Sequence, residues 1–324
     1  AVNTLFPFLT VEIWVVISCL VTWILLYFGS YKSLEKTLLV MVLFFSFMTM
    51  IIAIAMQSTD YQVSAAQVSS GLSFSFPSGY LPLALAVFGF TGISYGEIMA
   101  YTYWCLEKGY AENSGNNVEE TKHWIKTMQT DVWVTVFFIT LGTLPFFFLG
   151  AGVLYNIPEL QQSLATSSFW DIDVISSLQN MFSLVLGGWA KWLFIILAFF
   201  VLFSTLLSGT AAFTRTISDY LISMGLVKEQ ADTRKKLIKL IAFVIPFLSG
   251  LFYFVLPNPF TLLLIAGIWA AMGLPIVNIG ALYLVNKLEP ELQPKVTTKL
   301  ILWGSLVLQL SMAVLIIDDI LLAF

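Results

Sequence analysis

The residues best suited to chemistry lie together in one glycine-rich stretch of an otherwise apolar segment. They are Thr91, Gly92, Ile93, Ser94, Tyr95, Gly96 and Glu97, with Tyr101 one turn further on. Glycine disfavours a helix interior by about 1 kcal/mol relative to alanine, so a glycine cluster predicts a helix that opens here. Opened backbone at membrane depth persists only where it is buried or lines a cavity, and transporters use such breaks to contact their substrate. This stretch is therefore the candidate ion pathway.

Glu97 is the acidic group of this stretch, and two functional roles fit it: a ligand for a cation, or a group that carries a proton. A carboxylate in lipid costs several kcal/mol unless it faces a cavity or a partner. Helical spacing places Ser94, Glu97, Tyr101 and Lys108 on one face, which predicts the wall of an inner vestibule. The structural alternative is a hydrogen-bonded acid that ties this helix to a neighbour, with the glycines serving close helix packing.

A second polar position at depth is Asn278, which lies three residues after Pro275 in an apolar run. Proline removes one backbone hydrogen bond, so a kink is expected there, and the Asn278 amide needs a partner. We include Asn278 in the expected ion pathway. Asp131 precedes another apolar run and is expected to cap the start of its helix. Cys19 and Cys105 show no metal-ligand spacing and are expected to be packing residues.

The composition indicates which elements must position these residues. Of 324 residues, 59% are hydrophobic and only 10% are charged, whereas soluble domains carry roughly 25% charged residues. Such a chain requires a lipid bilayer as its partner. The sequence contains nothing that resembles a nucleic-acid-binding patch. We predict an all-α membrane protein, one transmembrane domain over residues 1–324. Its eight spans are expected at about 9–29, 36–56, 81–104, 132–155, 184–208, 238–256, 260–285 and 299–321.

The basic residues predict how these spans are oriented. With eight spans, the connecting segments alternate between the two sides of the membrane. Of the 15 Lys and Arg residues, all except Lys191 then lie on the same side. Since Lys and Arg accumulate on the cytoplasmic side, the C-terminus is expected outside. The protein is expected to be a multi-pass protein of the bacterial inner (cell) membrane.

Several segments give the chain its resemblance to a known family. They are Tyr31–Lys36, Gly71–Pro77, the run from Gly89 to Lys108, and Leu274 with Pro275. In order and pattern they resemble helices four to eleven of the natural-resistance-associated macrophage protein (NRAMP) family, in a divergent bacterial branch. The resemblance implies part of a LeuT-like inverted-repeat bundle. It also implies a secondary transporter that moves divalent metal cations by alternating access.

The chain departs from the family pattern where the metal is expected. The family's sixth helix carries Met-Pro-His-Asn, whereas the matching window here is Ile93-Ser94-Tyr95-Gly96. Without sulfur or imidazole, Thr91 and Glu97 are the candidate metal ligands. Such oxygen ligands favour Mg²⁺ or Mn²⁺, with Fe²⁺ as a further candidate. No cofactor is expected beyond the transported ion. Protons are a candidate coupling ion, although the family's helix-six histidines are missing.

Two more family features are missing: a glutamine of the tenth helix, and the Asp-Pro-Gly-Asn break of the first helix. The sequence is therefore expected to be an N-terminally truncated form that holds only part of the site. Alternatives are a transporter of a small organic solute such as an amino acid, or a non-transporting truncated homologue. An enzyme is not expected, because Glu97 is the only acid near the middle of a span and no span contains a histidine.

Overall fold

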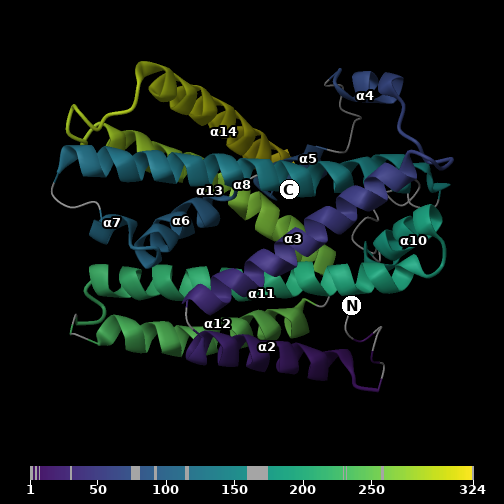
Figure 1. The fold of residues 1–324 in the computed structure, drawn as a ribbon, viewed down its shortest axis with the longest axis horizontal. Coiled ribbons are helices and arrows are strands. Elements are labelled where there is room, and N and C mark those ends of the chain that lie inside the picture. The colour runs from purple at the N-terminus through teal and green to yellow at the C-terminus, as the bar shows by residue number, and fades with distance from the viewer. Residues whose placement is uncertain are drawn as a thin grey trace. The chain divides into compact units, whose positions relative to one another are not determined.

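The computed structural model is helical over most of the residues it describes (Figure 1). Among the residues it describes, eight helical stretches are long and apolar enough to cross a membrane. This confirms the predicted all-α membrane fold with eight spans. The chain divides into two compact units, which are described separately below. The described residues are 3, 6, 8–29, 31–73, 81–90, 93–113, 117–158, 174–228, 230, 232–256 and 259–322.

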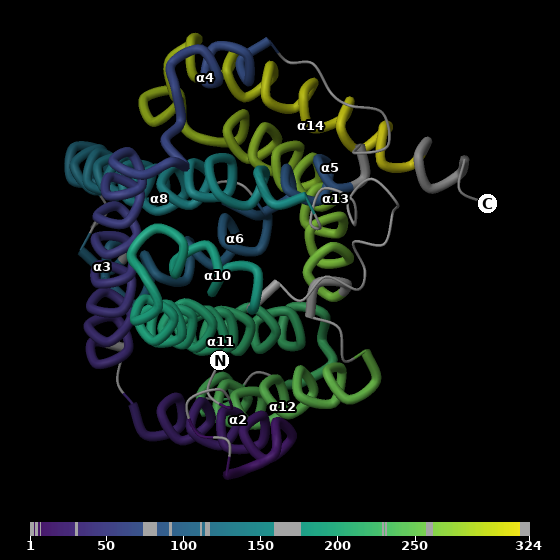
Figure 2. Tube along the Cα trace, turned by 90° about the vertical axis from the view of Figure 1, so that its right-hand side faces the viewer, coloured from purple at the N-terminus to yellow at the C-terminus, as the bar shows by residue number. Residues whose placement is uncertain are grey.

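Unit 1 comprises residues Ala1–Ser75 and Phe138–Phe260. Its longest helix, α11, contacts four neighbours; α12 and α2 lie on one side of it and α10 on the other, while α3 crosses it obliquely (Figures 1 and 2). Buried Ile52, Met56, Leu149 and Phe182 form the core. The helices are α2 (Val11–Phe28), α3 (Tyr31–Met56), α4 (Ala65–Gly71), α10 (Val174–Leu186), α11 (Ala190–Ser223) and α12 (Thr233–Val255), with the 3₁₀ turn η1 (Leu154–Asn156).

Unit 2 comprises residues Phe76–Phe137 and Thr261–Phe324. Its small core contains Leu85 from α5, Ala271 from α13 and Ile316 from α14, so these three helices share one buried centre. The helices are α5 (Leu81–Phe90), α6 (Tyr95–Glu107), α7 (Tyr110–Asn113), α13 (Pro259–Val285) and α14 (Val296–Leu322). Helix α8 (Val118–Gly152) begins in this unit and continues into unit 1 after Phe137.

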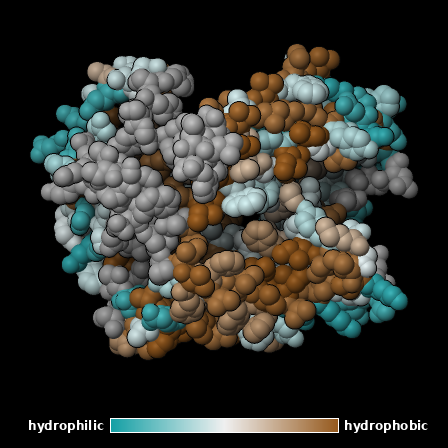
Figure 3. Space-filling view, turned by 180° about the vertical axis from the view of Figure 1, so that it is seen from behind, coloured by the Kyte–Doolittle hydropathy of each residue, from teal (hydrophilic) through white to brown (hydrophobic). Residues whose placement is uncertain are grey.

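Long apolar side chains cover much of the surface. Along α12, for example, Leu240, Leu248 and Phe252 are exposed. Together with the exposed apolar residues of α2 they form a broad hydrophobic surface, brown in the lower part of Figure 3. An apolar surface of this extent would be unstable in water, and it fits contact with lipid chains.

Helix α8 begins at Val118, well before residue 132, where we expected a span to start. Asp131 therefore lies inside a continuous helix, and the predicted capping role of Asp131 is wrong. Its carboxylate has side-chain partners instead, described below. Helix α11 likewise runs on to Ser223. Its hydroxyl residues bond back to carbonyls of the same helix, as Thr214 does to Ala211 at 2.7 Å, so they do not end it.

Candidate functional site

The glycine-rich stretch contains the helix interruption that its sequence predicts. Helix α5 ends at Phe90 and α6 begins at Tyr95. Between them Ile93 and Ser94 are not helical, and Ser94 has an extended backbone with φ −74° and ψ 165°. Two of the predicted pathway residues, Thr91 and Gly92, lie outside the described residues. The apolar segment thus crosses as two helices with opened backbone between them.

Glu97 lies in the first turn of the second helix. Its Oε2 accepts a hydrogen bond from the Ser94 backbone N–H at 2.7 Å, and its side chain is exposed. This is the reciprocal contact of a capping box, in which a Glu three residues after a Ser satisfies a free amide at the helix start. A carboxylate is also stabilised there by the helix dipole. The Ser-x-x-Glu spacing in the sequence is a local signal for this contact, in addition to placing the two residues on one helix face.

Tyr95 and Gly89, on either side of the interruption, both pack against α13. A Cβ atom at Gly273 of α13 would lie 2.5 Å from Cδ1 of Tyr95, so the ring of Tyr95 occupies space that this glycine leaves open. At Gly89, one residue before α5 ends, a Cβ would overlap the carbonyl oxygen of Gly267. Glycines therefore serve close packing of α5 and α6 against α13, in addition to the interruption itself.

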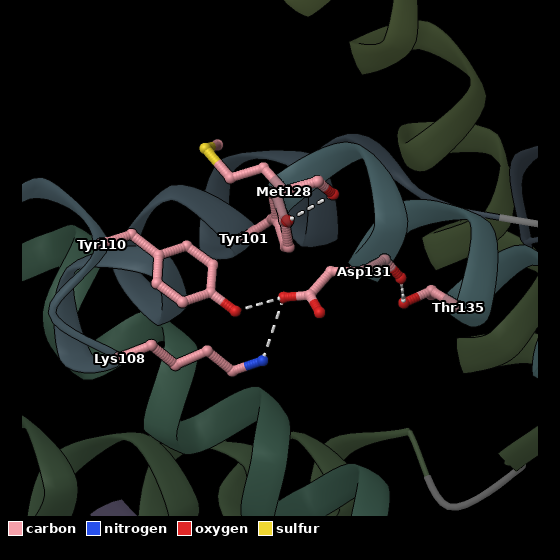
Figure 4. Close-up of polar contacts among 6 residues, drawn as sticks. All are labelled: Tyr101, Lys108, Tyr110, Met128, Asp131 and Thr135. Carbon is pink, nitrogen blue, oxygen red and sulfur yellow. Dashed lines mark hydrogen bonds and ion pairs between the residues drawn. The ribbon is translucent and has the colours of Figure 1, made fainter. Parts of the chain in front are cut away.

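A polar cluster joins the far end of α6 to α7 and α8 (Figure 4). Oδ2 of Asp131 accepts from the Tyr110 hydroxyl at 2.7 Å and pairs with Lys108 Nζ at 3.2 Å. The Tyr101 hydroxyl donates to the Met128 carbonyl at 3.2 Å. Desolvation, followed by the hydrogen bond to Asp131, raises the pKa of Tyr110, so this phenol remains a donor throughout the physiological range.

This cluster holds elements together and does not bring a metal-binding set together. Within the described parts of the chain, no group of three or more His, Cys, Asp or Glu side chains is close enough to hold a metal ion. Tyr101 was predicted as a pathway residue, and the structure places it against α8. Tyr110 and Asp131 were not predicted as partners, because a contact across 21 residues has no local spacing signal.

Asn278, the remaining predicted pathway residue, is buried and connects α13 to α14. Its Nδ2 donates to Ser305 Oγ at 2.8 Å and to Gln309 Oε1 at 3.1 Å. Its Oδ1 is buried and has no hydrogen-bond partner among the described residues. The hydrogen bonds described for Asn278 thus tie two helices together, and none of them leads to Glu97.

The family of the chain follows from a comparison with protein-family models. The model described as "Natural resistance-associated macrophage protein-like" matches residues 1–318, almost the whole sequence. The chain belongs to the Nramp family. No curated protein matches it closely enough to count as a relative. Nramp proteins are all-α membrane proteins of the LeuT fold that transport divalent metal cations and are not enzymes.

Membership gives the site its chemical context. As an Nramp protein the chain is an integral, multi-pass membrane protein whose substrate is a metal ion. The window Ile93-Ser94-Tyr95-Gly96 spans the interruption, and its side chains contain only one kind of donor atom, the hydroxyl oxygens of Ser94 and Tyr95. The interrupted α5–α6 pair is accordingly the candidate functional site of this Nramp chain.

Proposed function

We propose that this chain transports a hard divalent cation, Mg²⁺ or Mn²⁺ with Fe²⁺ as a weaker substrate, by alternating access around the interruption between α5 and α6. The observation that carries the proposal is the pair of helices ending at Phe90 and starting at Tyr95, with the Glu97 carboxylate at the opened backbone. Opened backbone in a membrane helix supplies carbonyl oxygens, and Glu97 adds a negative charge. Thr91 and Gly92 complete the proposed pathway.

The choice of ion rests on the chemistry of the side chains. Ile93, Ser94, Tyr95 and Gly96 contain neither sulfur nor imidazole. Hydroxyl, carbonyl and carboxylate oxygens favour hard cations, while soft thioether ligands favour later transition metals. We therefore propose Thr91 and Glu97 as metal ligands and place Mg²⁺ and Mn²⁺ ahead of Fe²⁺. The distribution of Lys and Arg supports an orientation with the C-terminus outside, in what we propose is a bacterial inner membrane.

The alternative substrate, a small organic solute such as an amino acid, is less well supported. A solute carboxylate would be attracted to a free helix N-terminus. At α6 the Glu97 carboxylate already lies at that end, where it accepts the Ser94 N–H. A second anion beside it would be repelled, whereas a cation would be attracted. This local charge favours a metal ion.

The test is metal uptake by the full natural protein in liposomes that contain a metal-sensitive dye. Glu97→Gln keeps a side-chain oxygen that can accept the Ser94 N–H, since Gln also forms capping boxes, but it removes the charge. We expect initial Mn²⁺ and Mg²⁺ uptake to fall about tenfold or more, as for loss of a metal-site partner. Glu97→Asp is expected to recover part of the rate.

The matched control is Glu112→Gln, which removes the charge of an exposed acid on α7. We expect this variant to transport at the wild-type rate. If Glu97→Gln is folded and transports metal as fast as Glu112→Gln, Glu97 is not a ligand. If the protein takes up amino acids and not metal, the organic-solute alternative holds instead.

A further inference from the structure

A cavity in unit 1 lies between the ends of four helices, α2, α3, α11 and α12. Its volume is about 40 Å³, and it opens onto solvent. Most of the lining is aliphatic, with Leu25, Leu26, Leu34 and Ile238 contributing side chains. The charged residue in this lining is Arg215 of α11. The cavity is therefore amphipathic: hydrocarbon walls with one guanidinium.

Two cations belong to this region. Arg215 is half-buried, and its Nη1 is positioned by a 2.9 Å hydrogen bond to the Ala211 carbonyl one turn earlier. Lys239 follows the lining residue Ile238, and its Nζ lies 4.5 Å from the ring centroid of Tyr27.

The cavity lies at the ends of membrane-spanning helices. Helix α2 ends at Phe28 and α3 begins at Tyr31, so the lining residues Leu26, Gly29 and Leu34 flank the turn between them. Helix α12 begins at Thr233, and three basic residues follow directly, at positions 234–236. Helix ends with clustered Lys and Arg lie where the headgroups of anionic lipids are concentrated.

We infer that this cavity binds an anionic phospholipid. The phosphate contacts Arg215 and Lys239, while an acyl chain lies along Leu25, Leu26 and Leu34. Basic pockets between transmembrane helices at this level are a known recognition mode for lipid headgroups. The aliphatic lining decides between the two sources of a phosphate, because free phosphate would gain nothing from four hydrocarbon side chains. This site is separate from the proposed metal pathway and does not depend on it.

The experiment measures lipid binding to the full natural protein after delipidation in detergent, by native mass spectrometry. The probes are phosphatidylglycerol, phosphatidylcholine with the same acyl chains, and inorganic phosphate. We expect phosphatidylglycerol to bind at least about fivefold more tightly than phosphatidylcholine, and inorganic phosphate not to displace it. Arg215→Gln and Lys239→Gln should each lower this preference about fivefold, the usual effect of one basic residue near anionic lipid.

Lys287→Gln is the matched control. Lys287 also lies over a tyrosine, with Nζ 5.5 Å from the ring centroid of Tyr283, but it belongs to unit 2 and does not line the cavity. The Lys287→Gln variant should prefer phosphatidylglycerol over phosphatidylcholine as strongly as the wild type does. The proposal is overturned if phosphatidylcholine binds as tightly as phosphatidylglycerol, or if inorganic phosphate displaces the lipid. It is equally overturned if the variants at 215 and 239 match the control. Should Arg215→Gln fail to fold, Lys239→Gln still decides the question.

Discussion

Two stretches of unit 2, the α5–α6 pair and α13, contain similar helix-disrupting residues and respond to them differently. The first contains Gly89, Gly92 and Gly96, and its helix stops at Phe90 and restarts at Tyr95. The second contains three glycines and Pro275, and α13 continues through all of them from Pro259 to Val285. Helices α8 and α12 likewise continue through their internal prolines. Disrupting residues alone therefore do not interrupt a membrane helix.

The difference lies in what receives the released backbone groups. In lipid an unpaired backbone group costs several kcal/mol, so a helix opens only where a substitute partner is available. At the α5–α6 interruption the Glu97 carboxylate accepts the Ser94 N–H, and the Ser94 carbonyl begins the new helix by accepting from Ile98 N at 3.1 Å. In α13 the polar side chain that follows Pro275 is Asn278, and it donates its hydrogen bond to Ser305 of α14 and not to its own helix. The comparison indicates that a cap, not a glycine, decides where the helix restarts.

The largest effect is expected where the two stretches touch. A methyl group at Gly89 would overlap the Gly267 carbonyl, and this neighbour is backbone and cannot rotate away. We expect Gly89→Ala to lower stability by about 2 kcal/mol or more, as for overpacking of a core. The loss is measured by heating the detergent-solubilised protein to a series of temperatures and quantifying the remaining folded protein by size-exclusion chromatography.

Gly280→Ala in α13 provides the control, because no atom lies within 4 Å of the added Cβ. Alanine is the better helix former, so this variant should be neutral or slightly stabilising. Equal melting temperatures for the two alanine variants would contradict the close approach of α5 and α13.

Much of the fold could be predicted from the sequence, because hydropathy over about 20 residues determines what crosses a bilayer. The helix interruption was predicted from the glycines before Glu97, but α13 shows that glycines alone are not a sufficient signal, and the cap spacing from Ser94 to Glu97 is the further one. The continuity of α8 from Val118 into its apolar part was not, because hydropathy does not register the polar helical turns at 118–131 as part of a span. The same limit produced the wrong capping role for Asp131.

The candidate site was less predictable. The position of Glu97 beside the interruption could be predicted from local spacing alone. The structure adds the hydrogen bond that the Glu97 carboxylate accepts from the Ser94 N–H. The partners of Asn278 and Asp131 lie 21 to 31 residues away along the chain. Such pairs depend on how helices pack, for which one sequence carries no periodic signal. The ligand role of Glu97 remains a prediction that the uptake experiment tests, and the ligand role of Thr91 remains a prediction.

An intermediate effect is expected at Asn278, the residue that connects α13 to α14. Hydrogen bonds between membrane helices contribute about 0.6 kcal/mol on average and up to about 1.7. Asn278→Leu removes the bonds to Ser305 and Gln309 and a longer one, 3.4 Å, to the Leu302 carbonyl, but also the buried Oδ1, so we expect a loss of about 1 kcal/mol. A double-mutant cycle with Gln309→Leu isolates the pair, and a coupling energy near zero would contradict the 3.1 Å contact.

The smallest effect is expected at Pro275. Because α13 is already continuous through this proline, replacing it should change the stability of the helix little. Pro275→Ala restores a backbone donor, which stabilises the helix, but it also deletes buried methylenes worth about 0.8 kcal/mol each. Because Pro275 is buried, the two changes oppose each other, and the melting temperature should shift by no more than the equivalent of about 1 kcal/mol. Metal uptake should stay near the wild-type rate if α13 is a continuous support for the interrupted pair. A large loss of uptake at unchanged stability would instead mean that α13 bends at Pro275 during transport, and that both stretches take part in the motion.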